Sequence, residues 1–218
     1  MTRWWTVATS FRSEALRYLG HRDQPITPDL KARLDEAEEA CERVARPAVW
    51  RCSFAPEEMR LPGADIARHL ADAVEVVLFA ATLGHGVDRE LRRLSMTDPL
   101  GQVLFDAAAT AAVERLADKT EASVRAEAAQ RGLYCSWRFS PGYGDLPLDV
   151  QPRVLSMLDA TRRLGITLSP SNLMVPTKSV TAIIGLHPTP QPGLASSCDV
   201  CQLAEFCTLR SGGTTCRG

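Results

Sequence analysis

The sequence predicts an α+β fold, because segments with helical and with strand character are mixed along the chain without regular alternation. The 218 residues are 45% hydrophobic, which is enough for the core of one large domain. Pro, Gly and Ser become frequent after residue 187. We therefore expect one α+β domain over residues 1–187, followed by a linker and tail over residues 188–218.

Two long helices are predicted where a capping residue precedes a proline. Thr27 starts a helix that should stop before Pro47, and Asp98 starts an alanine-rich helix that should continue to Gly132. The small side chains of the second helix allow another element or a ligand to approach it closely. Shorter helices are expected around residues 66–70, 87–94 and 150–164.

Three segments predict strands. Residues 74–82 are β-branched early and stop before Gly84, which favours a buried strand, although the pattern alone also fits a buried helix. Residues 133–139 alternate loosely and carry aromatic side chains, and residues 179–186 form the last predicted strand. A turn is expected at residues 140–145.

Charge and hydropathy indicate a cytoplasmic protein with neither a nucleic-acid nor a membrane partner. The formal net charge is -1, so the chain lacks the basic excess of a nucleic-acid binder. The N-terminus has no continuous apolar stretch like that of a signal peptide, and the longest apolar run, residues 76–83, is too short to cross a bilayer. In a reducing cytosol the 7 cysteines are not expected to form a stable disulfide framework.

The last 21 residues hold a cysteine cluster that predicts a metal site: Cys198, Cys201, Cys207 and Cys216. Thiolates in this number suit zinc or an iron–sulfur cluster. Zinc would fold the tail, whereas an iron–sulfur cluster would also carry an electron. A tail with free or disulfide-linked cysteines is the alternative.

The segment from Arg138 to Pro147 is the most informative loop of the chain. An arginine at the end of a predicted strand offers a fork of donors suited to a carboxylate. The Pro141-Gly142-Tyr143 turn that follows exposes backbone and one aromatic ring. From these residues alone, an ordinary strand-to-helix loop with a surface arginine is the better explanation of the segment, since loop Arg, Gly and Tyr are common.

This loop resembles the Arg-x-x-x-Gly-Tyr motif of the activation domain of cobalamin-dependent methionine synthase, and the segments upstream of it resemble the free-standing members of that family. Further motifs occur in the family's order and extend the resemblance over about half of the chain. They are Ala80 to Gly84, Val87-Asp88, Asp106 to Glu114, Leu168 to Ser171, Met174 to Pro176, Ser179-Val180 and His187-Pro188.

The resemblance implies a C-shaped α+β domain with a central antiparallel sheet flanked by helices. It implies that S-adenosylmethionine binds in a shallow groove, with Arg138 on its carboxylate, Glu114 near its cationic groups, and Pro141, Gly142 and Tyr143 forming the nearest wall. No catalytic residue is implied, and the chain would be an accessory component rather than a complete enzyme.

The implied function is reductive methylation of an inert cob(II)alamin on a partner. The chain lacks the Asp-x-His-x-x-Gly motif of a corrinoid-binding module, so the cobalamin would belong to a separate methionine synthase or another corrinoid protein. Flavodoxin or ferredoxin would supply the electron.

Two departures from the family pattern keep other functions open. Gly144-Asp145-Leu146-Pro147 replaces a Pro-Ala-Cys-Pro-x-His continuation, and a tyrosine pair usual after His-Pro is missing. The alternatives are a metal-stabilised interaction module without methyl-donor binding and an iron–sulfur electron carrier.

Overall fold

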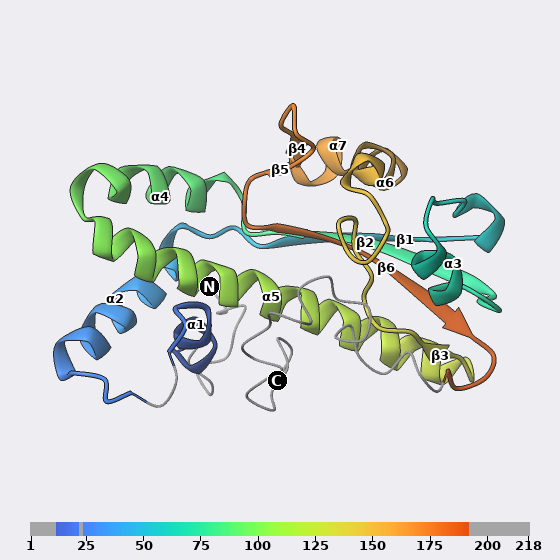
Figure 1. The fold of residues 1–218 in the computed structure, drawn as a ribbon, viewed down its shortest axis with the longest axis horizontal. Coiled ribbons are helices and arrows are strands. Elements are labelled where there is room, and N and C mark those ends of the chain that lie inside the picture. The colour runs from blue at the N-terminus through green and yellow to red at the C-terminus, as the bar shows by residue number, and fades with distance from the viewer. Residues whose placement is uncertain (1–11, 22–23, 192–218) are drawn as a thin grey trace.

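A four-stranded antiparallel sheet organises the molecule in the computed structural model, which describes residues 12–21 and 24–191 (Figure 1). Its strands lie in the order β1-β2-β6-β3, so β1 and β3 form the two edges. They are β1 (Ala48–Phe54), β2 (Glu75–Thr82), β6 (Ser179–His187) and β3 (Tyr134–Cys135). A separate two-stranded ladder joins β4 (Thr167–Leu168) to β5 (Met174–Val175).

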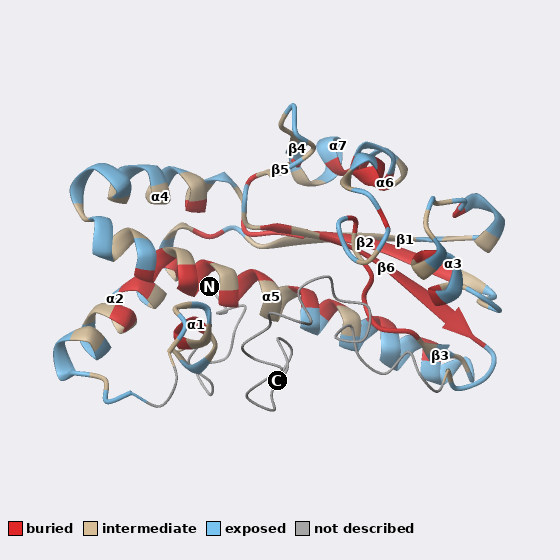
Figure 2. Ribbon diagram, in the orientation of Figure 1, coloured by how far each residue is buried: buried red, intermediate tan, exposed pale blue. Residues whose placement is uncertain are grey.

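The alternation of side chains along β2 explains why both faces of the sheet are covered. Val77, Phe79 and Ala81 pack against the long helix α5 (Pro99–Gln130), while Val76 and Leu78 belong to the core on the opposite face. Figure 2 shows the resulting buried centre of the sheet. The opposite face carries α3 (Ala64–His69), the 3-10 turn η2 (Leu148–Val150), α6 (Gln151–Met157) and α7 (Ala160–Leu164).

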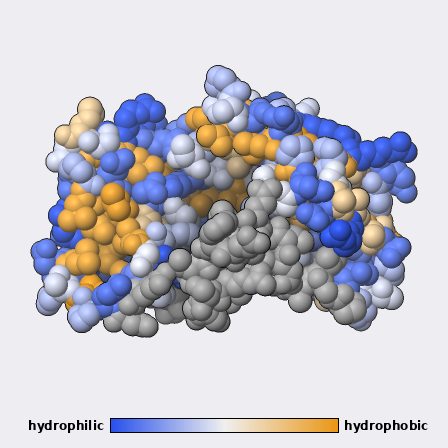
Figure 3. Space-filling view, viewed as in Figure 1, coloured by the Kyte–Doolittle hydropathy of each residue, from blue (hydrophilic) through white to orange (hydrophobic). Residues whose placement is uncertain are grey.

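A helical cluster extends the molecule beyond the sheet at the N-terminal end of α5. There α5 packs on α1 (Arg12–Tyr18), α2 (Pro28–Val44) and α4 (His85–Thr97). Alanines 108, 109 and 112 of α5 are buried in this contact, so the small side chains serve close helix packing. Figure 3 shows apolar side chains at this end of the molecule, and the exposed Met96, Leu100 and Val103 belong to the α4–α5 junction.

The two helix starts predicted from capping residues are confirmed. Thr27 accepts a hydrogen bond from the Leu30 amide at 3.2 Å, and Asp98 accepts one from the Gly101 amide at 3.0 Å. The strands at 74–82 and 179–186 are confirmed as β2 and β6, and the short helices at 66–70 and 87–94 as α3 and α4. Across the described ranges, no helix is long and apolar enough to span a bilayer.

Two expectations are corrected by the structure. The helix expected over 150–164 is divided, because Asp159 has a φ of 50° and separates α6 from α7. The strand expected over 133–139 pairs regularly only at Tyr134 and Cys135. The strand β1 and the 3-10 turn η1 (Pro56–Glu58) were not anticipated. β1 is an edge strand with intermediate burial at nearly every position, which weakens its hydrophobic pattern.

Candidate functional site

A bulge in the strand after β3 determines which way Arg138 points. The Ser136 amide donates to the Gly185 carbonyl at 2.9 Å, and Phe139 exchanges backbone hydrogen bonds with Ile183 at 2.8 and 2.9 Å. The chain therefore advances three residues while β6 advances two, which is a β-bulge. Ser136, Trp137 and Phe139 contact the α3 side of the sheet, and Arg138 contacts α5.

The Arg138 side chain is only 5% exposed and lies against a row of carboxylates on α5. Its Nη2 is 2.5 Å from Asp118 Oδ1 and 3.3 Å from Glu114 Oε2, and its Nε is 3.0 Å from Glu121 Oε2. These acidic residues are spaced i, i+4 and i+7, so they share one face of the helix. A desolvated guanidinium needs such partners, because an unpaired buried charge is strongly destabilising.

The structure thus joins two of the predicted site residues, Arg138 and Glu114, which lie 24 positions apart in the sequence. It also adds Asp118 and Glu121, which the sequence analysis missed. Their helical spacing from Glu114 was the available signal. The charged site therefore contains three carboxylates around one guanidinium.

Glu121 is the best-anchored of these carboxylates. Its side chain is 12% exposed, and its Oε1 accepts a hydrogen bond from Arg125 Nη2 at 2.9 Å. Arg125 Nη1 donates to the Cys135 carbonyl at 3.0 Å. Glu121 is therefore fixed to the sheet edge through Arg125, while its Oε2 forms an ion pair with the Nε of Arg138 at 3.0 Å.

The predicted wall of the site, Pro141 to Tyr143, forms a tight turn. The Tyr143 amide donates to the Ser140 carbonyl at 3.0 Å, and the Gly142 amide donates to the Leu146 carbonyl at 2.9 Å. Gly142 has a φ of 92° and is exposed, whereas Pro141 is buried. The turn leaves backbone and the Tyr143 side chain accessible at one edge of the sheet.

Tyr143 extends an aromatic cluster rather than the charged row. Its ring is 44% exposed and lies 6.1 Å from the Phe139 ring and 6.5 Å from the Trp137 ring, between centroids. Both neighbours pack on the α3 side of the sheet, whereas Arg138 points to the α5 side. A ligand that touches both Arg138 and Tyr143 must therefore lie across the sheet edge.

The turn is fixed to the first turn of α3 by two aspartates. Asp145 accepts hydrogen bonds from the Ala64 amide at 2.6 Å and from the Asp65 amide at 3.1 Å. Gly63 and Gly144 allow this contact, because a Cβ atom on either would lie 2.5 or 2.4 Å from an aspartate oxygen. Gly144 and Asp145, which depart from the family pattern, thus stiffen the loop.

The predicted metal ligands Cys198, Cys201, Cys207 and Cys216 lie outside the described residues. Within residues 12–21 and 24–191, no group of His, Cys, Asp and Glu side chains is arranged to hold a metal ion. Of the described cysteines, Cys41 is fully buried, and burial raises the pKa of its thiol to about 12. A thiol with that pKa stays protonated and is a poor metal ligand at neutral pH.

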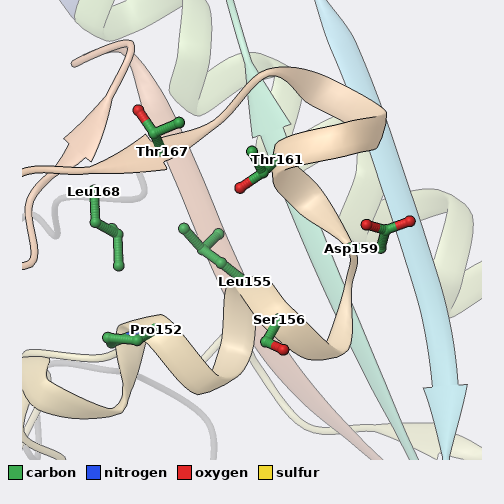
Figure 4. Close-up of a pocket in the computed structure, with 7 residues that line it drawn as sticks. All are labelled: Pro152, Leu155, Ser156, Asp159, Thr161, Thr167 and Leu168. Atoms are coloured by element: carbon green, nitrogen blue, oxygen red, sulfur yellow. The ribbon is translucent and has the colours of Figure 1, made fainter.

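A hollow of about 400 Å³ lies elsewhere, between α6, α7 and β4 (Figure 4). Apolar side chains and hydroxyl groups line it, and its one carboxylate belongs to Asp159, which forms an ion pair with Arg162. None of the predicted site residues contributes to its wall. The sheet edge at Arg138 remains the candidate site.

The antiparallel sheet, the helix-borne carboxylates and the Arg-x-x-x-Gly-Tyr loop together define an activation-domain type of protein. Residues 64–208 match the model of the family described as "Vitamin B12 dependent methionine synthase, activation domain". The chain belongs to this family.

A solved structure, the crystal structure of the MetH reactivation domain bound to AdoHcy, has the same fold. The two chains are 15% identical and superpose with a TM-score of 0.58, over 96% of this chain and 85% of the other. No curated protein matches the sequence.

Proposed function

We propose that this protein binds S-adenosylmethionine at the β3 edge of its sheet and presents the methyl group to cobalamin on a separate corrinoid protein. The observation that carries this proposal is the buried Arg138, held by α5 carboxylates directly before the Pro141 to Tyr143 turn. Membership of the activation-domain family and the AdoHcy bound to the related structure support this choice of ligand.

The charges at the site suit the charges of the ligand. S-adenosylmethionine carries a carboxylate, an ammonium group and a sulfonium. Arg138 would bind the carboxylate, and Glu114 would lie near the cationic groups, because opposite charges attract strongly at a partly desolvated edge. Pro141, Gly142 and the half-exposed Tyr143 would cover the neighbouring part of the ligand.

The methyl transfer requires this chain to position the methyl donor and does not require acid–base catalysis by its residues. Once an electron donor such as flavodoxin or ferredoxin has reduced cob(II) to cob(I), the cobalt is a strong nucleophile. It takes the methyl group from the sulfonium, which leaves methylcobalamin and S-adenosylhomocysteine. The protein contributes by holding the sulfonium in line with the cobalt, which lowers the entropic part of the barrier.

For the cysteine tail we keep the proposal of a zinc or iron–sulfur site at Cys198, Cys201, Cys207 and Cys216. Metal analysis of anaerobically purified protein, with Cys201→Ala as the comparison, tests this. If the protein contains zinc and no iron, the metal has a structural role in the tail and the tail does not transfer electrons. Iron with a visible absorbance that is lost in Cys201→Ala would support electron transfer.

Calorimetric titration with S-adenosylmethionine tests the binding proposal. We expect wild type to bind and Arg138→Lys to bind about ten-fold more weakly, because lysine keeps the charge but loses the guanidinium fork. Arg51→Lys is the matched control, because Arg51 also pairs with a carboxylate of α5, that of Glu127 at 2.6 Å, but lies outside the candidate site. No binding by wild type at millimolar ligand would favour an interaction module instead.

Reconstitution with a corrinoid protein tests whether this protein presents the methyl group to cobalamin. With S-adenosylmethionine near the wild-type Kd, a cob(II) corrinoid protein and a reductant should yield several-fold more methylcobalamin in a fixed time with wild type than with Arg138→Lys. Equal yields from both proteins would remove Arg138 from the assignment.

A further inference from the structure

The three carboxylates around Arg138 differ in how firmly they are held. Asp118 is 60% exposed, Glu114 is 39% exposed and Glu121 is 12% exposed. Glu121 is also bound by Arg125, so it is the fixed partner. The closest contact to the guanidinium, 2.5 Å at Nη2, nevertheless comes from Asp118, the most exposed of the three.

Asp118 therefore occupies the Nη2 donor of Arg138, which a ligand carboxylate would also use under the proposed function. A free carboxylate on the ligand and the Asp118 carboxylate both seek the same Nη2 donor at hydrogen-bond distance. Because the site already holds more negative than positive charge, adding a fourth carboxylate without moving one away is unfavourable. The side chain that can leave most easily is the one mostly in water.

We propose that Asp118 is a built-in competitor of the methyl donor, which occupies Arg138 in the free protein and is displaced by the ligand's carboxylate. Glu121 acts as the positioning residue, because it keeps the Nε edge of Arg138 oriented in both states. Glu114, also on the exposed side of the row, remains for the ligand's ammonium group. This inference rests on the proposed binding of S-adenosylmethionine.

Competition of this kind weakens the apparent affinity in proportion to the fraction of time that Asp118 occupies Arg138. Removing the Asp118 carboxylate should therefore tighten binding, whereas loss of an ordinary ligand contact would weaken it. The direction of the change distinguishes the competitor from a direct ligand contact.

The test is a titration of the full-length protein with S-adenosylhomocysteine, which carries the same carboxylate and cannot transfer a methyl group. Asp118→Asn should bind it about five-fold more tightly than wild type, by the occupancy argument. Asp118→Ala should also bind it more tightly, and alanine at this position is compatible with α5 because of its high helix propensity. Glu121→Gln should bind about ten-fold more weakly, because Arg138 loses its fixed partner.

Two controls isolate the effect. Glu127→Gln removes one negative charge from an exposed position of the same helix, where Glu127 pairs with Arg51, and should leave the affinity unchanged. 5′-Methylthioadenosine lacks the amino-acid part of the ligand, so its affinity should be the same for wild type and Asp118→Asn.

Equal or weaker binding of S-adenosylhomocysteine by both Asp118 variants, with wild type still binding, would overturn the competition and leave the proposed function standing. Tighter binding of 5′-methylthioadenosine to the same extent would also overturn it, since the effect would not involve the carboxylate. Absence of binding by every protein, wild type included, would overturn the proposed function and this inference together.

Discussion

Asp145 and Asp65 fasten the Tyr143 turn to the start of α3 by reciprocal hydrogen bonds. Asp145 accepts from the backbone amide of Asp65 at 3.1 Å, and the side chain of Asp65 accepts from the backbone amide of Asp145 at 3.3 Å. The two residues are 80 positions apart in the sequence. The wall of the candidate site is therefore stiffened before any ligand arrives, which reduces the entropy lost on binding.

Asp145→Ala should lower the free energy of unfolding by about 1–2 kcal/mol, because it leaves two amides at the start of α3 without their acceptor. It should also weaken S-adenosylhomocysteine binding, since the turn loses its support. Urea unfolding and calorimetry measure the two effects. Asp149→Ala, which removes an exposed contact to Asn172, is the control and should change neither.

Gly144→Ala should be more destabilising than Gly132→Ala. Both glycines have a positive φ, 50° and 72°, but a Cβ on Gly144 would lie 2.4 Å from Asp65 Oδ2, whereas nothing lies within 4 Å at Gly132. Conformational strain alone accounts for about 1 kcal/mol at Gly132, and displacement of Asp65 adds to this at Gly144. Equal losses in urea unfolding would mean that the close approach has no energetic weight.

Arg138→Ala should lower the free energy of unfolding by about 3 kcal/mol, because it removes a side chain that is only 5% exposed and that pairs with the partly buried Glu121 and Glu114. Arg51→Ala removes a surface ion pair with the same helix and should cost less than about 1 kcal/mol. For this reason Arg138→Lys, and not the alanine variant, is the better test of ligand binding. Similar losses for the two alanine variants would contradict the burial argument.

Glu75 should make the stability depend on pH through its ion pair with Arg131 at 2.5 Å. The hydrogen bond from Arg131 holds the pKa of Glu75 below its ordinary value of 4.5. The unfolded state then binds a proton more readily than the folded state. The stabilisation is therefore present above pH 4.5 and lost as the pH falls through the lower folded pKa.

Glu75→Gln removes this pH-dependent contribution. The difference in unfolding free energy between wild type and variant should be largest near pH 7, where it is below about 1 kcal/mol, and should shrink towards pH 3. Urea unfolding at several pH values measures it. A difference that grows on acidification would reverse the sign of the argument.

Local signals were sufficient for the parts of the fold that depend on local chemistry. Thr27 and Asp98 cap the helices they were expected to cap, since a capping side chain bonds to amides only a few residues away. Asp159, with its positive φ, ended α6 inside a segment whose hydrophobic pattern looked continuous. Side-chain periodicity does not report such a break.

Only part of the candidate site could be predicted, because the rest depends on contacts between residues far apart in the sequence. Arg138 and Glu114 came from the family resemblance, and the structure joins them. The bulge that turns Arg138 towards α5 depends on the pairing of Ser136 with Gly185 and of Phe139 with Ile183, so no local pattern predicted it. Asp118 and Glu121 were not singled out from the sequence, because only their contacts with Arg138 distinguish them from the other charged residues of α5.

The most direct measurement is a crystal structure of this protein with S-adenosylhomocysteine. We expect the ligand to lie across the β3 edge, with its carboxylate on Arg138, its nucleoside near Tyr143, and Asp118 turned into solvent. A ligand bound elsewhere, for instance in the hollow between α6, α7 and β4, with Asp118 still on Arg138, would contradict the account.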